Sequence, residues 1–130
     1  MDLRVFIVDD NPSFLAAARV LLEREGLSVV GDASTAADAI RQDEELRPDV
    51  ALVDITLGPE SGFELARGLR ERDCDGRLKV ILVSTYAEAD FADLIAESPA
   101  NGFLTKSELS AEAIRRILDG RSCSPPVPLR

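Results

Sequence analysis

Hydrophobic residues in this chain form short unbroken runs, separated by longer segments in which apolar positions recur every three or four residues. The runs lie at 4–8, 27–30, 50–53, 78–83 and 102–105. Most lack the apolar-polar alternation of a strand with one wet face, so they are typical of strands buried on both sides. The run at 27–30 is weaker, because Ser28 interrupts it. The pattern predicts five strands alternating with five helices.

Polar residues that cap helices and residues that break them set the expected helix ends. The first expected helix is capped by Ser13 and ends at Gly26, and the second is capped by Ser34 or Thr35 and ends at Pro48. The third lies between the turn-rich loop 58–62 and Asp73, and the fourth spans 88–97. The fifth is capped by Ser107 or Ser110 and ends at Gly120. The third of these is expected to turn Phe63, Ala66 and Leu69 inward.

Alternating strands and helices favour the α/β class, here a single doubly wound, five-stranded parallel sheet with helices on both faces and right-handed crossovers. A chain of 130 residues is long enough to bury one such core. Residues 1–120 are expected to form this domain. Residues 121–130 contain three prolines and are expected to be a tail or a linker.

Composition excludes several classes of function. The formal net charge of −9 argues against a nucleic-acid surface, which needs clustered Lys and Arg. No apolar run approaches the length of a membrane span, and the amino terminus lacks a leader pattern, so a cytoplasmic location is expected. The chain has no histidine, which rules out imidazole nucleophiles, imidazole metal ligands and a phosphohistidine on this chain. Cys74 and Cys123 have no motif spacing.

Carboxylates follow two of the buried runs. Asp9 and Asp10 end the first run, and Asp54 ends the third. If the strand order is 2-1-3-4-5, these two strands are neighbours, and their carboxyl ends meet in the crevice where open α/β sheets bind ligands. Three carboxylates this close repel one another unless a cation lies among them. A hard divalent ion that accepts a few carboxylates and keeps several waters fits best, which predicts Mg²⁺.

The other two strand ends complete a reaction centre. Ser84 ends the fourth run and Lys106 follows the fifth. Phosphoryl transfer to a carboxylate requires a nucleophile, a metal and a further cation for the phosphoryl oxygens. Asp54, Mg²⁺ and Lys106 would supply these in turn, and the hydroxyl of Ser84 could bond a phosphoryl oxygen.

These five separately placed features resemble the receiver domain of two-component response regulators. The likeness covers residues 4–118 and includes the acidic pair, the acceptor Asp54 with Gly62 after its loop, Ser84, and the sequence G-F-L-T-K ending at Lys106. Together they are a specific signal, although each alone would be weak. The strand order 2-1-3-4-5 is taken from this resemblance.

The resemblance implies a role for each of these residues. Asp54 would accept a phosphoryl group from a sensor histidine kinase or a histidine phosphotransfer protein. The Mg²⁺ ligands would be Asp10 directly, Asp9 mostly through water, Asp54 and the backbone carbonyl of Thr56. Lys106 would pair with the phosphoryl group, so the domain would be a phosphoacceptor and not an enzyme acting on other substrates.

The resemblance also implies a switch. Ser84 would move toward the phosphoryl group and Phe103 would turn inward. The output would be a changed protein-interaction face on the fourth helix, fifth strand and fifth helix, for an unknown downstream protein, and this face also allows a homodimer through the fourth and fifth helices. Neither direct nucleic-acid binding nor membrane binding is expected.

Among several departures from the family pattern, two directly follow site residues. Ser107 stands where many members have proline, and Thr85 stands where alanine is common, which would narrow access to the site. Neither departure removes an essential group.

Rival functions use the same residues. A flavodoxin-like cofactor binder would need a phosphate loop after the first strand, where Asp9 and Asp10 instead repel phosphate. A dehalogenase-type phosphatase would need a second Asp two residues after Asp54, where Thr56 stands. A degenerate receiver acting as a constitutive protein-binding module would not need the complete site. Because no helix-turn-helix follows Leu118, a stand-alone receiver is favoured, with the receiver of a longer regulator as the alternative.

Overall fold

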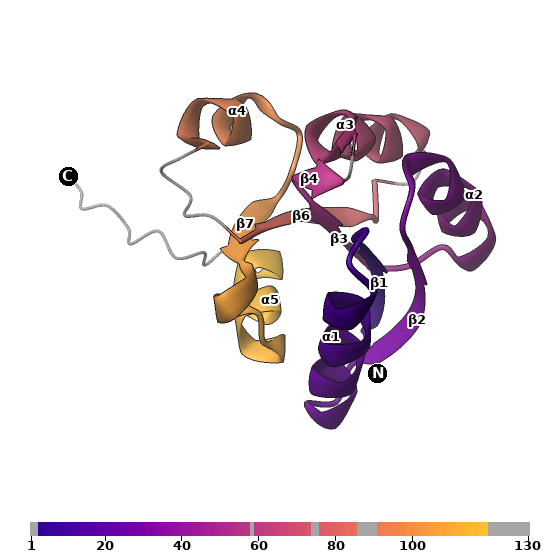
Figure 1. The fold of residues 1–130 in the computed structure, drawn as a ribbon, viewed down its shortest axis with the longest axis vertical. Helices are drawn as coiled ribbons and strands as arrows, with labels where there is room; N and C mark the ends of the chain where they lie inside the picture. The colour runs from indigo at the N-terminus through magenta and orange to yellow at the C-terminus, as the bar shows by residue number, and fades with distance from the viewer. Residues whose placement is uncertain (1–2, 58, 74–75, 86–90, 120–130) are drawn as a thin grey trace.

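A five-stranded parallel sheet forms the centre of the molecule (Figure 1). The computed structural model describes residues 3–57, 59–73, 76–85 and 91–119. The strand order is β2-β1-β3-β6-β7, which is the expected 2-1-3-4-5 order once the short strands β4 and β5 are set aside. The strands of this sheet are β1 (Arg4–Val8), β2 (Ser28–Ala33), β3 (Val50–Asp54), β6 (Lys79–Ser84) and β7 (Gly102–Thr105).

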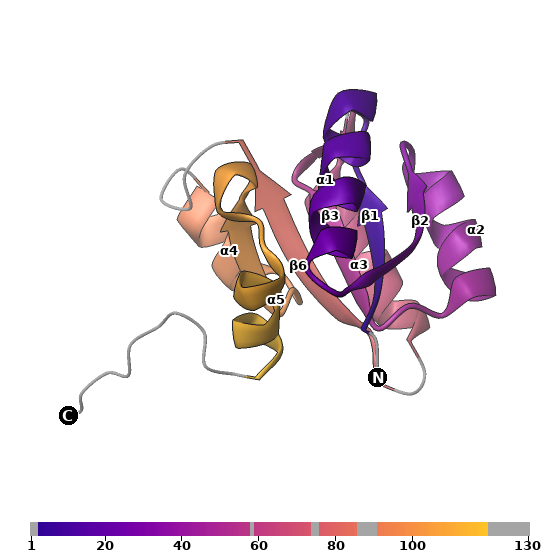
Figure 2. The same ribbon diagram turned by 90° about the horizontal axis from the view of Figure 1, so that it is seen from below.

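Helices cover both faces of the sheet, as the strand pattern predicted (Figures 1 and 2). One face is covered by α1 (Pro12–Arg24) and α5 (Ala111–Leu118), and the other by α2 (Ala36–Leu46), α3 (Gly62–Arg72) and α4 (Ala92–Glu97). Side chains of each strand alternate between these two cores. Val5 and Ile7 of β1 pack toward α1 and α5, whereas Phe6 and Val8 pack toward α2 and α3. This two-sided burial explains why the strands are continuous apolar runs.

The start of α1 differs from the prediction, which placed the cap at Ser13. Asn11 is the cap, because its side-chain oxygen accepts hydrogen bonds from the backbone N–H groups of Ser13 at 2.9 Å and Phe14 at 3.3 Å. Pro12 then occupies the first helical position, where its missing N–H has no helical partner to lose. The capping predictions at Thr35 and Ser110 are confirmed.

Strand β2 is longer than the predicted run at 27–30. A bulge at Val30 shifts the pairing with β1, so that Val5 faces Val29 but Phe6 faces Gly31. The strand then continues through Asp32 and Ala33. A Cβ atom at position 31 would lie 2.7 Å from a methyl carbon of Leu46, so glycine allows α2 to approach the strand closely.

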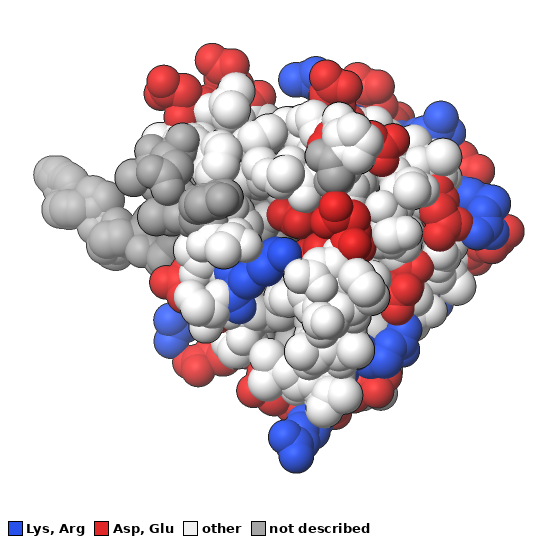
Figure 3. Space-filling view, in the orientation of Figure 1, with Lys and Arg blue, Asp and Glu red and all other residues white. Residues whose placement is uncertain are grey.

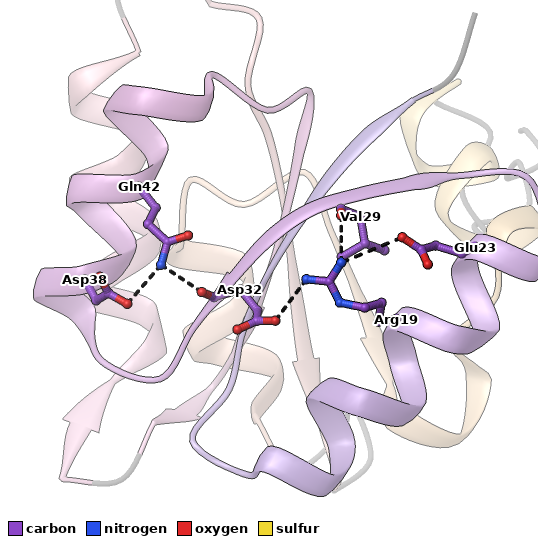
Figure 4. A network of polar contacts seen from close by, with 6 residues as sticks. All are labelled: Arg19, Glu23, Val29, Asp32, Asp38 and Gln42. Carbon is purple, nitrogen blue, oxygen red and sulfur yellow. Dashed lines mark hydrogen bonds and ion pairs between the residues drawn. The ribbon is translucent and has the colours of Figure 1, made fainter.

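Side chains from two helices bond to β2, which is an edge strand of the sheet (Figure 4). Arg19 of α1 donates a hydrogen bond to the Val29 carbonyl at 3.0 Å and pairs with Asp32 at 3.1 Å. Gln42 of α2 donates to the Asp32 carbonyl at 2.8 Å. These bonds occupy backbone acceptors that an exposed edge would otherwise offer to another strand.

The loop after Asp54 contains a small antiparallel hairpin that the sequence did not predict. Its strands are β4 (Thr56–Leu57) and β5 (Glu60–Ser61). Ser61 caps α3, whose buried residues include Leu65, Ala66 and Leu69. Phe63, predicted to point inward, is only half-buried.

The fourth helix ends at Glu97 as predicted, and the fifth runs over Ala111–Leu118 with Ser110 as its cap, one of the two predicted caps. Within the described residues α4 begins at Ala92, and the part of the predicted 88–97 helix before residue 91 lies outside them. A 3₁₀ turn, η2 (Lys106–Glu108), separates β7 from α5. The predicted tail at 121–130 also lies outside the described residues. Among the helices that the structure describes, none has the length and apolarity to cross a bilayer.

Candidate functional site

The end of β1 places two neighbouring carboxylates in different surroundings. The Asp9 N–H donates to the Ala33 carbonyl at 3.0 Å, which continues the sheet pairing by one residue and turns the Asp9 side chain inward. Asp9 is therefore 1% exposed, whereas Asp10 is exposed to solvent. One oxygen of Asp9, Oδ1, accepts a hydrogen bond from the Asn11 N–H at 2.8 Å. The loop thus fixes Asp9 and leaves Asp10 accessible.

Asp54 ends β3, immediately beside the end of β1. Its side chain is buried, and Oδ1 accepts a hydrogen bond from the Thr56 N–H at 3.2 Å. Gly62 packs directly against the backbone of Asp54, since a Cβ atom at position 62 would lie 2.0 Å from the Asp54 carbonyl oxygen. Glycine at the start of α3 is therefore required for the loop to close behind Asp54.

Lys106 brings a positive charge from the end of β7 to these carboxylates. Its Nζ lies 2.7 Å from Asp9 Oδ2 and 3.6 Å from Asp54 Oδ2, and its side chain is 19% exposed. The ammonium also lies over the ring of Phe14, 4.4 Å from the ring centroid. Three strand ends and the first turn of α1 therefore converge on one point.

Burial, and after it the neighbouring Asp9 charge, raise the pKa of Asp54, which is about 6 once all its neighbours are included. The positive charge of Lys106 and the hydrogen bond from Thr56 oppose this shift, whereas the charge of Asp10 adds to it least. Asp54 is thus mostly ionised at pH 7.5, but its ionisation costs more free energy than that of an exposed aspartate.

The three carboxylates can hold a cation. One oxygen from each of Asp9, Asp10 and Asp54 lies within 4.8 Å of the others, and Figure 3 shows acidic atoms gathered near the centre of this face beside a basic side chain. Asp9 Oδ2 is buried, and among the described residues its charged partner is the Lys106 ammonium, 2.7 Å away. Three carboxylates face one ammonium, so the site remains acidic. These hard oxygen donors fit Mg²⁺.

The remaining predicted residues are Ser84, Thr56 and Phe103, and only the first two lie beside this centre. Ser84 ends β6, is 2% exposed, and pairs in the sheet with Thr105, directly before Lys106. Thr56 is exposed and bonds Asp54 through its backbone N–H. Phe103 is half-buried on β7 and packs against the core on the α4 side of the sheet. The structure therefore brings the carboxylates of Asp9, Asp10 and Asp54 together and Lys106 to two of them, whereas Phe103 faces a different part of the molecule.

Three residues near the site were missed by the sequence analysis. Phe14 was assigned only to the buried face of its helix, although its ring also meets Lys106. Asn11 was assigned to a loop, although the pair Asn11-Pro12 is a recognisable helix-start signal. Glu60 sits in the hairpin, and its carboxylate accepts a hydrogen bond from the Ala36 N–H of α2 at 2.9 Å.

Comparison with known proteins agrees with the fold and the site. The family model described as "Response regulator receiver domain" matches residues 5–119. Among curated relatives, response regulator GacA of Pseudomonas aeruginosa is 33% identical, with 92% of this chain and 56% of that protein covered. Transcriptional regulatory protein DesR of Bacillus subtilis is 31% identical, with 92% and 60% covered. The chain thus spans less than two thirds of the length of these relatives.

Solved structures that resemble this chain are also response regulators or receiver domains. A two-component response regulator of the LuxR family from Aurantimonas superposes with a TM-score of 0.78 at 32% identity, covering 93% of this chain and 88% of that one. A CheY-like receiver domain protein from Methanospirillum hungatei gives 0.76 at 26% identity, covering 93% and 94%. Receiver domains are phosphoacceptors, and phosphorylation and Mg²⁺ are typical of them. The order of strands, the match over residues 5–119 and these relatives show that the chain belongs to the response regulator receiver domain family of two-component systems.

Proposed function

We propose that this domain accepts a phosphoryl group on Asp54 from a phosphohistidine of a sensor kinase or a phosphotransfer protein in the cytoplasm, and that this event switches a protein-interaction face. The observation that carries the proposal is the position of the Asp54 carboxylate. It is buried, lies 3.6 Å from the Lys106 ammonium, and shares its site with Asp9 and Asp10.

The proposed transfer is a displacement at phosphorus. An Asp54 carboxylate oxygen forms a bond to phosphorus as the phosphorus–nitrogen bond of the donor breaks, and the electron pair of that bond stays on the imidazole nitrogen. The raised pKa of about 6 still leaves Asp54 mostly ionised at pH 7.5, as a nucleophile must be. Lys106 is placed to pair with the negative phosphoryl oxygens.

Asp9, Asp10, Asp54 and the backbone carbonyl of Thr56 are the proposed metal ligands. When bound, Mg²⁺ would neutralise charge on the phosphoryl oxygens. The chain's own contribution is the fixed orientation of its ligands. The Asn11 N–H holds Asp9, and the Thr56 N–H holds Asp54.

Ser84 and Phe103 are the proposed switch residues. Ser84 lies on the strand beside Asp54 and is buried there, where its hydroxyl would turn toward a phosphoryl group on Asp54. Phe103 is half-buried, so it can move further inward. The proposed readout is the face of α4, β7 and α5, through an unidentified protein partner or a homodimer.

A longer regulator is the second candidate context for this domain. GacA and DesR extend well beyond the segment that this chain matches, and DesR is named a transcriptional regulatory protein. Under this alternative the same Asp54 chemistry controls an attached output domain. Under the stand-alone alternative it controls contacts with a separate protein.

An intact-mass experiment tests the phosphoacceptor proposal. The protein is incubated with acetyl phosphate and Mg²⁺ beside Asp54→Asn, a chelator control, and Asp93→Asn, which removes an exposed carboxylate on α4. Wild type and Asp93→Asn should each gain one phosphoryl mass, while the Asp54→Asn and chelator samples should gain none.

Two results would count against the proposal. Phosphorylation of Asp54→Asn would place the acceptor elsewhere. Failure of the wild type with both acetyl phosphate and a phosphorylated kinase would leave a constitutive binding module as the better account.

A further inference from the structure

The ring of Phe14 lies directly beside the Lys106 ammonium. The nitrogen lies 4.4 Å from the ring centroid, within the range of a cation–π contact. The same nitrogen lies 2.7 Å from Asp9 Oδ2 and 3.6 Å from Asp54 Oδ2. Two carboxylates and an aromatic face therefore enclose the charge.

The ring is held in place by the start of α1. The Phe14 N–H donates to the side chain of Asn11, the helix cap, and the ring packs against the core between the sheet and α1. Asn11 in turn donates its own N–H to Asp9. The position of the ring is thus tied to the position of the acidic loop.

We propose that Phe14 is a positioning residue for phosphoryl transfer, acting through Lys106; this inference rests on the proposed phosphoacceptor function. A lysine side chain has many rotamers, and a hydrated ammonium group does not favour any one of them strongly. The aromatic face replaces water on one side of the ammonium while favouring its charge. Phe14 thereby keeps Lys106 beside Asp54 when the phosphoryl group arrives, which lowers the entropy lost on reaching the transition state.

Two variants distinguish the effect of the aromatic face of Phe14 from the effect of its apolar volume. Phe14→Leu keeps an apolar side chain but removes the aromatic face, and Phe14→Tyr keeps the face. Phe63→Leu is the matched control, because Phe63 is also a half-buried residue in the first turn of a helix that starts at this edge. The ring of Phe63 meets the ring of Phe91, with 6.4 Å between their centroids.

The first measurement is the rate of phosphorylation by acetyl phosphate with Mg²⁺, followed by intact mass. Phe14→Leu should react roughly three- to tenfold more slowly than the wild type, and Phe14→Tyr should restore the rate to within about twofold. Phe63→Leu should also stay within about twofold of the wild type.

The second measurement detects the contact without relying on activity. The sequence has two lysines, Lys79 and Lys106, so protein labelled with ¹³C at lysine Cε gives two assignable signals. The Lys106 ε-protons should be shifted upfield by the ring in the wild type and in Phe14→Tyr, and should lose that shift in Phe14→Leu. Lys79 begins β6, at the end of the strand away from the site, so its signal should keep the same chemical shift in every variant.

The outcomes separate this inference from the function on which it rests. A phosphorylated wild type with an equally fast Phe14→Leu would overturn the role of Phe14 alone. A ring-current shift that is absent from the wild type would do the same. A wild type that accepts no phosphoryl group from either donor would overturn the proposed function, and the role of Phe14 with it.

Discussion

Asp54 must stay ionised in surroundings that oppose its ionisation. Burial and the charge of Asp9 raise its pKa to about 6, against 3.8 for an ordinary aspartate. The unfolded chain therefore releases this proton near pH 4, whereas the folded chain keeps it until about pH 6. Between these two values the folded state binds more protons, so stability falls as the pH rises. Above about pH 6 the penalty is complete, and it reaches about 2 to 3 kcal/mol.

Asp54→Asn should remove this penalty in protein kept free of metal. The amide carries no charge to desolvate, and its oxygen can still accept the hydrogen bond from the Thr56 N–H. We expect the variant to match the wild type near pH 4 and to be more stable by about 2 kcal/mol at pH 7.5. Urea unfolding in the presence of chelator at both pH values measures this difference. A constant difference across the pH range would show that Asp54 does not titrate in this way.

Gly62 and Gly68 give a matched pair of glycines in α3. A Cβ atom at position 62 would lie 2.0 Å from the Asp54 carbonyl oxygen, whereas one at position 68 would have nothing within 4 Å. Gly62→Ala should cost about 3 kcal/mol or more, because backbone must move to admit the methyl group. Gly68→Ala should stabilise the helix by up to about 1 kcal/mol. Equal unfolding midpoints for the two variants in urea would contradict this account of the loop.

At the scale of elements, two helices receive carboxylates from distant segments at their first turns. Glu25, at the end of α1, accepts a hydrogen bond from the Ala111 N–H of α5 at 2.6 Å. Glu60, in the hairpin after Asp54, accepts one from the Ala36 N–H of α2 at 2.9 Å. Helix N-termini carry unsatisfied N–H groups and a partial positive charge, so both contacts are favourable. They also link neighbouring elements at their ends.

Glu60→Ala should destabilise the protein by about 0.5 to 1 kcal/mol, the usual value of a capping interaction at an exposed helix start. Glu60→Gln keeps an oxygen acceptor and should lose less. Glu71→Ala, an exposed change near the other end of α3, should leave stability nearly unchanged. Chemical denaturation of the four proteins compares them directly. If Glu60→Ala and Glu71→Ala have the same effect, the bond to Ala36 contributes nothing to stability.

The elements that the sequence predicted well are those whose signal is local. The apolar run at 50–53 identified a strand buried on both faces, and the polar residue after it identified the strand end. The extension of β2 was missed because the pattern stops at Gly31 and Asp32, and only the approach of α2 explains a glycine there. The hairpin around Glu60 was missed for a similar reason, since two-residue strands have too few positions to show a period.

The candidate site follows the same rule. Asp9, Asp10, Asp54 and Lys106 could be predicted because each lies at the end of a strand or within two residues after it, and parallel strands end at one edge. The contact between Phe14 and Lys106 could not be predicted, because it joins a helix face to a strand end 92 positions away in the chain (106 − 14). An apolar residue at that spacing is equally typical of an ordinary core position.

At the scale of the whole molecule, metal binding and global stability are linked. The chain carries a formal net charge of −9, and three of its carboxylates lie within 4.8 Å at one site. Any ion that binds the folded site more tightly than the unfolded chain stabilises the fold by mass action. When the free ion concentration is one hundred times the dissociation constant, the gain in the free energy of unfolding is about 2.7 kcal/mol. Mg²⁺ should therefore raise the unfolding temperature of the wild type.

Asp10→Asn should separate this specific effect from general screening of negative charge. Asp10 is exposed, so its loss should change the stability of the metal-free protein little, but it removes a proposed ligand. Asp93→Asn removes one exposed negative charge on α4 and serves as the control. Thermal unfolding with and without Mg²⁺ should show stabilisation of the wild type and Asp93→Asn, and most of it should be lost in Asp10→Asn. The same Mg²⁺ response in all three proteins would mean that the ion only screens surface charge, and would remove the metal from the proposed mechanism.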